Sequence, residues 1–302
     1  MAAGGAPPYN TVDATLWYFE AARQYVAETQ DLATLEALFP VLAGIVEAHA
    51  RGTRYQIHVD PADELLYGGG PGVQLTWMDA KIGDWVVTPR TGKPVEVNAL
   101  WINALESMAR FAQLLGRAGK LYQDRSAAAK RSFARFWNPA RGCCYDVLDS
   151  PATGDDPALR PNQIFAVSLP VSPLSDAQQK QVVDLCARDL LTPVGLRSLA
   201  PAEPGYAGAY AGGPRERDSV YHQGTVWGWL LGPFSLAHYR VYRDRGAARA
   251  FLACLAGTID RYGLGSLAEV FDGDPPHKPG GCIAQAWTVG ELLRAWRELR
   301  AG

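Results

Sequence analysis

The feature that most constrains the fold of this chain is a repeated pairing of helical segments. Apolar residues recur at three- and four-residue spacing, which is typical of amphipathic helices that bury one face. Very short breaks separate the two members of the first pairs, so those members must run antiparallel. The nine segments that we expect to be helical are 12–28, 31–50, 95–117, 120–137, 161–169, 175–191, 223–243, 247–263 and 282–300.

Within each pair the first segment is richer in Trp, Asn and Gln, and the second carries more charge, as in 124–135. This alternation is expected when one helix lines a cavity and its partner faces water. The pattern therefore predicts an all-α fold with helical pairs arranged around a centre, an α/α toroid. Because the pairing continues across every loop, we expect one domain over residues 1–302.

Long segments rich in Gly and Pro separate the pairs, and segments of this length in a compact domain are usually functional or disordered. The first of them contains two extended runs, 54–60 and 65–69, which we expect to form a small β-hairpin. The four long segments are 52–94, 138–160, 192–222 and 264–281.

Charge and cysteine content exclude several classes of protein. A net charge of −2 and a pI near 6.2 leave no basic field for nucleic acid or anionic lipid. The five cysteines include no CxxC pair, which fits a reducing cytosol better than a disulfide framework. No apolar run reaches about 18 residues, and the N-terminus lacks a signal-peptide pattern. We therefore expect a cytoplasmic protein without nucleic-acid or membrane partners; its oligomeric state is not indicated.

Motifs for several other chemistries are absent from the sequence. The glycine-rich run 68–72 is not followed by Gly-Lys-Ser/Thr, which argues against a phosphate-binding loop. The five histidines are scattered without the spacing of a helical zinc site, and no G-x-S-x-G motif is present. We therefore expect no metal and no cofactor.

Asp79 is the first candidate for catalysis. Trp77 precedes it by two residues, so both side chains would point the same way in an extended segment. An indole beside a carboxyl group excludes water, which raises the carboxyl pKa and keeps the group protonated as an acid. The alternative is that Asp79 caps a turn, and the spacing alone favours neither.

Glu269 is the second candidate. It lies in an apolar setting before a run of turn residues. Burying an unpaired carboxylate is costly, so such a residue is expected to have a catalytic role or an ion-pair partner. A salt bridge to an arginine is the alternative. Two acids on loops at one mouth of a helical barrel would suit glycosidic cleavage, in which one protonates the leaving oxygen and the other activates water.

Polar and aromatic residues near helix starts would ring one end of a toroid and form a sugar-sized pocket. For Asp13, stabilisation of a helix N-terminus is an alternative, and for each Trp the alternative is ordinary core packing. The expected substrate-binding residues are Asp13, Trp17, Trp77, Glu96, Asn98, Trp101, His222, Gln223, Trp227, Gln285 and Trp287.

Seven stretches between residue 9 and about 297 resemble, in the same order, the C-terminal amylo-α-1,6-glucosidase domain of glycogen-debranching enzymes. TWMDAK, YHQGTVW and the terminal AQAW segment are the most specific, because strings similar to GKPVEVNALW occur in several sugar-cleaving toroids. The seven stretches are YNTVDATLWYF, QLTWMDAK, GKPVEVNALWINAL, RPNQIFAVSLP, DSVYHQGTVWGWLLGPF, AEVFDGD and GCIAQAWTVGELL.

The resemblance implies an (α/α)6 barrel that hydrolyses the α-1,6-linked glucose left at a trimmed branch point, with inversion and no cofactor. The implied partner is an α-glucan such as glycogen or limit dextrin. The resemblance further implies that Asp79, the Asp of TWMD, is the general acid, and that Glu269, before VFDG, is the general base. Inversion needs carboxyl groups about 6.5 to 9.5 Å apart.

The chain also departs from that family pattern. An (α/α)6 barrel has twelve helices, whereas about nine are visible here, and the chain begins at a motif that lies inside the family domain. We therefore expect an incomplete toroid that lacks the first helical pair. Two alternatives to the debranching activity follow: a non-catalytic glycan-binding remnant or fragment, and a glucoamylase-like or trehalase-like α-glucosidase.

Overall fold

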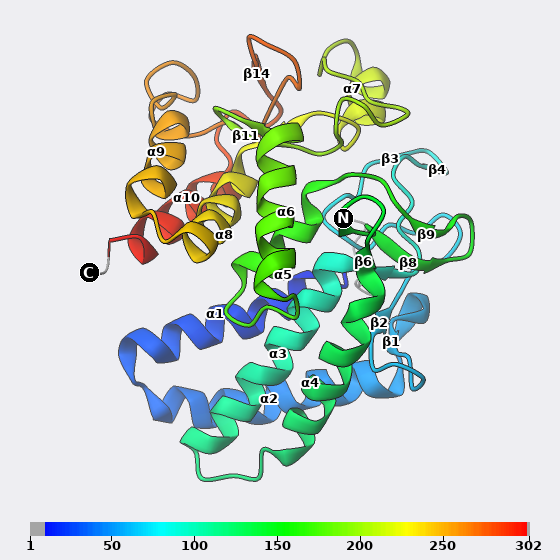
Figure 1. Ribbon diagram of the computed structural model, residues 1–302, viewed down its shortest axis with the longest axis vertical. Coiled ribbons are helices and arrows are strands. Elements are labelled where there is room, and N and C mark those ends of the chain that lie inside the picture. The colour runs from blue at the N-terminus through cyan, green and yellow to red at the C-terminus, as the bar shows by residue number, and fades with distance from the viewer. Residues whose placement is uncertain (1–9, 301–302) are drawn as a thin grey trace, which may run out of the picture.

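Ten α-helices and five small β-sheets make up the described part of the chain, residues 10–300, in the computed structural model (Figure 1). Helical segments match the sequence expectation closely in the first half of the chain, and α7 is an addition. The helices are α1 (Ala14–Thr29), α2 (Leu32–Arg51), α3 (Val95–Leu114), α4 (Lys120–Phe133), α5 (Phe165–Ser168), α6 (Asp176–Asp189), α7 (Pro214–Val220), α8 (Leu231–Tyr242), α9 (Arg245–Ala256) and α10 (Ala286–Glu298).

Five helices form a row of successive neighbours: α1, α3, α5, α8 and α10. A second layer packs on this row, with α2 on α1 and α3, α4 on α3, α6 on α5 and α8, and α9 on α8 and α10. The two ends of the row touch through Gln24 and Glu298, whose polar atoms are 3.4 Å apart, and through an Arg297–Glu28 ion pair. The expected alternation of inner and outer helices is therefore confirmed.

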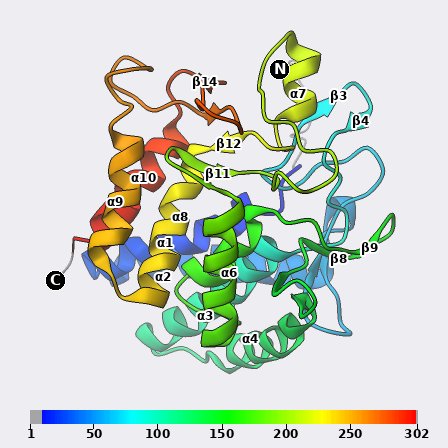
Figure 2. The same ribbon diagram turned by 45° about the horizontal axis from the view of Figure 1, so that its top comes forward.

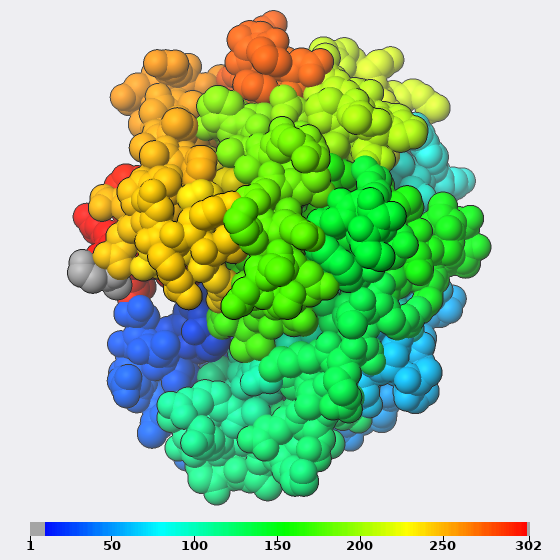
Figure 3. All heavy atoms as spheres, viewed as in Figure 1, coloured from blue at the N-terminus to red at the C-terminus, as the bar shows by residue number. Residues whose placement is uncertain are grey.

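Burial follows the chemical contrast between paired helices. In α3, 16 of 20 residues are buried, whereas in α4 only 4 of 14 are buried. The charged helix α4 belongs to the outer surface, which it shares with α6 on the face drawn in Figure 3. The expectation that one helix of a pair is internal and the other faces water is met here, because apolar burial sets which helix is inside.

Among residues 10–300, α2 has the length and mean hydropathy of a membrane-spanning helix. One such helix is weak evidence of a membrane, since core helices of soluble proteins meet the same criterion. Leu35, Phe39, Leu42 and Val46 of α2 are buried in the hydrophobic core. These contacts are those of a packed helix.

Three helical predictions were too long, and one of them, 247–263, is helical only to Ala256. The segment 223–243 is helical only from Leu231, because Val226–Trp227 forms strand β12 between two other strands and a 3-10 turn (Gly228–Leu230) follows. The segment 161–169 starts as a 3-10 turn (Pro161–Ile164) before the single turn of α5. In the segment 223–243, strand pairing overrides the helical period of the sequence.

The all-α expectation also missed most of the small sheets. The largest is an antiparallel sheet at one end of the helices (Figures 1 and 2), with strand order β10 (Leu191–Thr192), β11 (Gly195–Arg197), β12 (Val226–Trp227), β13 (Val270–Phe271) and β14 (Pro279–Gly280). The expected hairpin over 54–69 is present as β1 (His58–Val59) and β2 (Leu66–Tyr67). The remaining strands are β3 (Lys81–Ile82), β4 (Trp85–Val86), β5 (Lys93–Pro94), β6 (Trp137–Asn138), β7 (Cys143–Cys144), β8 (Val147–Ser150) and β9 (Gly154–Asp156).

Candidate active site

The five-stranded sheet sets the position of Glu269. In β12 and β13, Trp227 pairs with Val270, so the neighbouring Glu269 lies opposite Gly228, whose N–H approaches the Glu269 carbonyl at 3.4 Å. On the other side, Glu269 N–H donates to the carbonyl of Cys282 at 3.0 Å. The backbone of this carboxylate residue is therefore held between two strands rather than on a free loop.

The Glu269 side chain is half-buried and is held by neutral donors. Its Oε2 accepts from the Cys282 N–H at 2.8 Å, and its Oε1 accepts from the Gln285 amide at 2.9 Å. Burial raises the pKa of the nearby Tyr221 phenol, and the Glu269 carboxylate contributes to this shift. The salt bridge to arginine that was the alternative for Glu269 is not found within residues 10–300. The Glu269 carboxylate is therefore fixed by hydrogen bonds and not by an ion pair within residues 10–300.

Gly281 is required beside this carboxylate. Its φ is +67°, in the left-handed region that glycine tolerates. A Cβ added there would also collide with the Glu269 carboxylate. Both the backbone conformation and the space next to the carboxylate therefore depend on the absence of a side chain.

Asp79 lies at the start of the β3–β4 hairpin with 66% of its side chain exposed. Trp77, in contrast, is 6% exposed, so the prediction that the two side chains point the same way is wrong. The physical reason is that the chain bends at residues 76–77, and the alternation of an extended strand does not apply there. The indole of Trp77 therefore does not shield the Asp79 carboxyl from water.

Residues 221 and 222 connect the two acids. His222 is fully buried, and its Nε2 lies 3.8 Å from Asp79 Oδ1. Burial lowers the pKa of His222, while Asp79 opposes this shift. The preceding residue, Tyr221, has its pKa raised by burial and by its hydrogen bond to Glu269, with a further contribution from the Asp79 charge. Both carboxyl groups therefore act on adjacent side chains of one short segment.

Aromatic rings form a continuous cluster beneath the acids. Trp77 makes edge-to-face contacts with His222, Trp227 and Trp229 at centroid distances of 5.2 to 5.3 Å. His222 stacks on Trp227 at 5.0 Å, and Trp229 stacks on Trp287 at 4.5 Å. Trp287 is 38% exposed at the edge of the cluster and offers a face to a ligand.

Trp17 lies at another edge of this cluster. It is half-buried and meets Phe165 edge-on at 5.6 Å, and Phe165 in turn stacks on Trp229 at 5.4 Å. Trp77, Trp227 and Trp229 are buried core aromatics, whereas Trp17 and Trp287 keep some exposed surface. The structure thus brings four of the five predicted tryptophans into one aromatic cluster.

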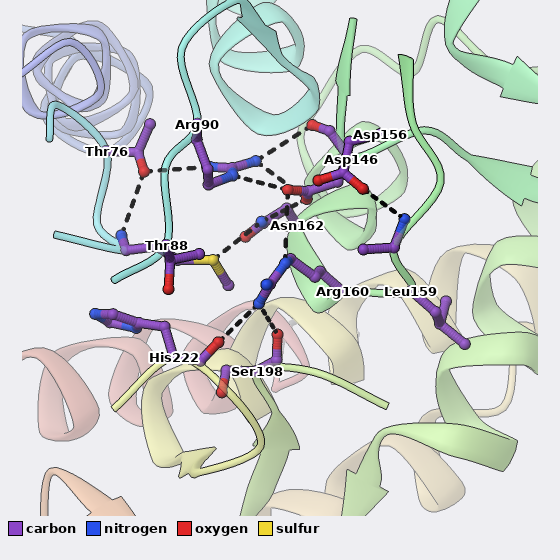
Figure 4. A network of polar contacts seen from close by, with 12 residues as sticks. Thr76, Thr88, Arg90, Asp146, Asp156, Leu159, Arg160, Asn162, Ser198 and His222 are labelled. Carbon is purple, nitrogen blue, oxygen red and sulfur yellow. Dashed lines mark hydrogen bonds and ion pairs between the residues drawn. The ribbon is translucent and has the colours of Figure 1, made fainter. Parts of the chain in front are cut away.

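A buried polar network supports the cluster (Figure 4). Arg90 forms ion pairs with Glu96 and Asp146, and Asp146 Oδ1 accepts from Asn162 Nδ2 at 2.7 Å. Asn162 Oδ1 then accepts from the Trp77 indole N–H at 2.8 Å. Burial disfavours the Arg90 charge, but Asp146 and Glu96 outweigh this effect and raise the Arg90 pKa.

Arg160 extends this network to the segment that carries Tyr221 and His222. It donates to the carbonyl of His222 at 2.7 Å and to Gln223 Oε1 at 3.0 Å. Its guanidinium also lies 3.9 Å from Asp146. The backbone of that segment is therefore tied to the same buried charges that position Trp77.

Asp13 fixes the backbone of the segment that leads to Asp79. It occupies the N-cap position of α1, but its carboxylate makes no capping bond within that helix. Its Oδ2 instead accepts from the Trp77 backbone N–H at 2.7 Å, and burial raises the Asp13 pKa. Asp13 is buried and therefore positions the loop before Asp79 rather than facing a substrate, which corrects the expectation that it binds sugar.

Three other expected substrate-binding residues are fully enclosed. Glu96 pairs with Arg90, Asn98 bonds the backbone of Leu66, and the Trp101 indole donates to the carbonyl of Glu64 at 3.1 Å. All three are at most 1% exposed. The expectation that these residues face a sugar is therefore corrected. The segment 52–94 covers the first turn of α3, so the side chains of that turn contact this segment instead.

Gln223 and Gln285 have positioning contacts. Gln285 is the N-cap of α10, where its Oε1 accepts from the Trp287 N–H, and its amide donates to Glu269. Gln223 accepts from Arg160 and donates to Val87 and Thr88 at 3.3 Å. Sequence reasoning missed Tyr221, Trp229, Asn162 and Arg160, although all four lie inside the motifs that were quoted.

The paired-helix arrangement is similar to that of the α/α-toroid glycoside hydrolases. A family model described as amylo-alpha-1,6-glucosidase matches residues 1–294, and the chain therefore belongs to that family. Glycogen debranching enzyme of Saccharomyces cerevisiae is 24% identical over 333 residues, covering 80% of this chain and 21% of the yeast protein. The chain thus spans about a fifth of that relative's length.

Solved structures with the same fold come from Thermus thermophilus. A GH63 mannosylglycerate hydrolase in complex with glucose has a TM-score of 0.69 and 14% identity over 99% of this chain and 78% of that chain. An uncharacterized conserved protein has a TM-score of 0.68 and 14% identity over 98% and 79%. At these identities the two structures show the fold alone.

Proposed function

We propose that this protein is an inverting glycoside hydrolase that releases glucose from α-1,6 branch stubs of an α-glucan, with Asp79 as general acid and Glu269 as general base. The observation that carries the proposal is that the Cys282 N–H and the Gln285 amide fix the Glu269 carboxylate, while His222 Nε2 lies 3.8 Å from Asp79 Oδ1. Family membership and the yeast debranching relative support the substrate class.

Glu269 and Asp79 lie in different environments, and an inverting reaction requires different roles of its two carboxyl groups. Glu269 is oriented by two neutral donors and has no cation paired to it among the described residues, which suits a group that takes a proton from water as the water attacks the anomeric carbon. Asp79 gives its proton to the leaving glycosidic oxygen as the carbon–oxygen bond breaks. The Asp79 side chain is 66% exposed, so it is open to a bound substrate and Trp77 does not cover it.

The direct test is glucose release from a phosphorylase limit dextrin by the purified chain, followed by proton NMR at early times. We expect β-glucose as the first product, because a water that attacks opposite the leaving group inverts the anomeric centre. Release of α-glucose would exclude inversion. Preference for an α-1,4 or α,α-1,1 glucan, or for mannosylglycerate, over the limit dextrin would exclude the debranching assignment.

Gly281→Ala should lower this activity by about two orders of magnitude without unfolding the protein. A left-handed alanine is strained by roughly 1–2 kcal/mol, and its Cβ displaces the Glu269 carboxylate. A misplacement of about 1 Å can cost about 10²-fold in rate. The control is Gly290→Ala in α10, where an added Cβ has open space around it and activity should be retained. Equal activity of the two variants would contradict the role of Gly281.

We also propose that the activity is cytoplasmic and needs no cofactor. All five cysteines are free thiols, and three of them are buried, which suits a reducing compartment. Within residues 10–300, no cluster of three metal-ligating side chains is found.

A further inference from the structure

A cavity lies on the flank of the molecule beside β8 and β9, the two strands drawn at the right of Figure 1. Its volume is about 600 Å³, and we call it the flank cavity. Known ligand sites span roughly 300–1,000 Å³, so it is large enough for a small molecule or part of a polymer. Its lining includes Tyr67, Thr88, Ala152, Asp156, Arg160 and Gln223.

The charges of the flank cavity do not favour an ionic ligand. Arg90 and Arg160 both line it, but Arg90 is paired with Glu96 and Asp146, and Arg160 lies 3.9 Å from Asp146. Asp156 adds a further carboxyl group. No cationic surplus is left for a phosphate or carboxylate, and the lining residues include no His or Cys for a metal. The ligand that fits is neutral.

Neutral hydrogen-bonding groups are abundant in the same cavity. Thr88, Ser150 and Thr153 supply hydroxyl groups. Arg160 is 7% exposed, and its Nε donates no hydrogen bond within the described residues. Tyr67 is half-buried and adds an aromatic ring, which is a good platform for a sugar ring. A hydroxyl-rich neutral molecule with apolar ring faces, a saccharide, matches this lining.

Gln223 joins the flank cavity to the catalytic groups. It lines the cavity and directly follows His222, which lies against Asp79. Its amide donates to Val87 and Thr88, in the segment that follows the β3–β4 hairpin. We propose that the flank cavity is a second α-glucan subsite, which holds the polymer part of the substrate while the branch glucose lies at Asp79 and Glu269. This inference rests on the proposed function.

The test compares a polymeric with a small substrate in two variants. Tyr67→Ala removes the aromatic platform, and Ala152→Trp fills the cavity from an exposed position that the fold does not depend on. We expect both variants to raise KM for limit dextrin about tenfold, with kcat unchanged and with unchanged kcat/KM for α-glucosyl fluoride. The control is Tyr18→Ala, at an exposed tyrosine of α1 outside the cavity. This variant should change neither KM for limit dextrin nor kcat/KM for α-glucosyl fluoride.

A binding measurement separates failure of this inference from failure of the proposed function. Maltoheptaose is titrated calorimetrically into the Glu269→Gln protein and into the same protein carrying Tyr67→Ala or Ala152→Trp. Loss of maltoheptaose binding in both double variants supports the subsite. If the wild-type chain then hydrolyses no substrate, the proposed function is wrong but the subsite still stands. Equal binding in all three proteins, or equal KM values for limit dextrin, would overturn the subsite.

Discussion

Glu269→Gln should lower the rate of glucose release from limit dextrin by about 10²–10⁴-fold, which is the usual contribution of a general base. The amide cannot take a proton from water. The introduced NH₂ group would also face hydrogen-bond donors, because the Cys282 N–H and the Gln285 amide both donate to this side chain. The loss is measured as kcat, with the fold checked by circular dichroism.

Asp79→Asn should show a different dependence on the leaving group. Glucan hydrolysis should fall by a similar factor, because the departing oxygen is no longer protonated. Hydrolysis of α-glucosyl fluoride should be largely retained, since fluoride leaves without a proton, whereas Glu269→Gln should lose that reaction too. Asp84→Asn, an exposed acid in the same β3–β4 hairpin, is the matched control. If both Asp79→Asn and Glu269→Gln hydrolysed limit dextrin at the wild-type rate, these two residues would not be the general acid and general base.

The helical part of the fold could be predicted because each helix carries its own signal. The alternation between buried α3 and charged α4 is present in the local sequence and needs no knowledge of the rest of the chain. The five-stranded sheet has no such signal, because its strands are two or three residues long and come from segments far apart. It nevertheless sets where Glu269 lies against β12.

The sequence predicted which residues lie near the candidate site better than it predicted how their side chains are oriented. Asp79, Glu269, His222 and Trp287 lie around one aromatic cluster, but Trp77 turns inward because the chain bends beside it. A spacing of two residues is informative only where the backbone is extended.

The exposure of polar residues near helix starts could not be read from the sequence. Glu96 has the same local pattern as a site carboxylate, yet it is enclosed because Arg90, six residues earlier, folds back onto it. Asp146 reaches the same guanidinium from a distant hairpin. Pairings of this kind depend on tertiary contacts, which a single sequence does not display.

Arg90→Met should destabilise the protein by about 3–5 kcal/mol, which is the effect of breaking a buried ion pair by removing one partner. The Arg90 side chain is 3% exposed, and those of Glu96 and Asp146 are each 2% exposed. Its removal leaves the buried Glu96 without an ion pair and leaves Asp146 with only the longer, 3.9 Å contact to Arg160. The measurement is urea unfolding followed by tryptophan fluorescence.

Arg135→Met is the matched control for this change. Arg135 also pairs with two carboxylates, Asp63 and Asp149, but it is 41% exposed, and Lys93 still pairs with both carboxylates after its removal. We expect a loss of about 0–1 kcal/mol there. Equal destabilisation by the two variants would show that burial does not set the value of the Arg90 pairs.

A compensated variant separates charge from packing in the Arg90 network. Glu96→Gln and Asp146→Asn, added to Arg90→Met, remove the unpaired charges, and the amide oxygen introduced at position 146 can still accept from Asn162. We expect the triple variant to recover much of the lost stability, because neutral groups are less costly to bury than unpaired ions. Glucose release should recover along with it, since Asn162 then holds the Trp77 indole as before. If stability returns while activity does not, the charge of Arg90 acts on the site directly rather than through the position of Trp77.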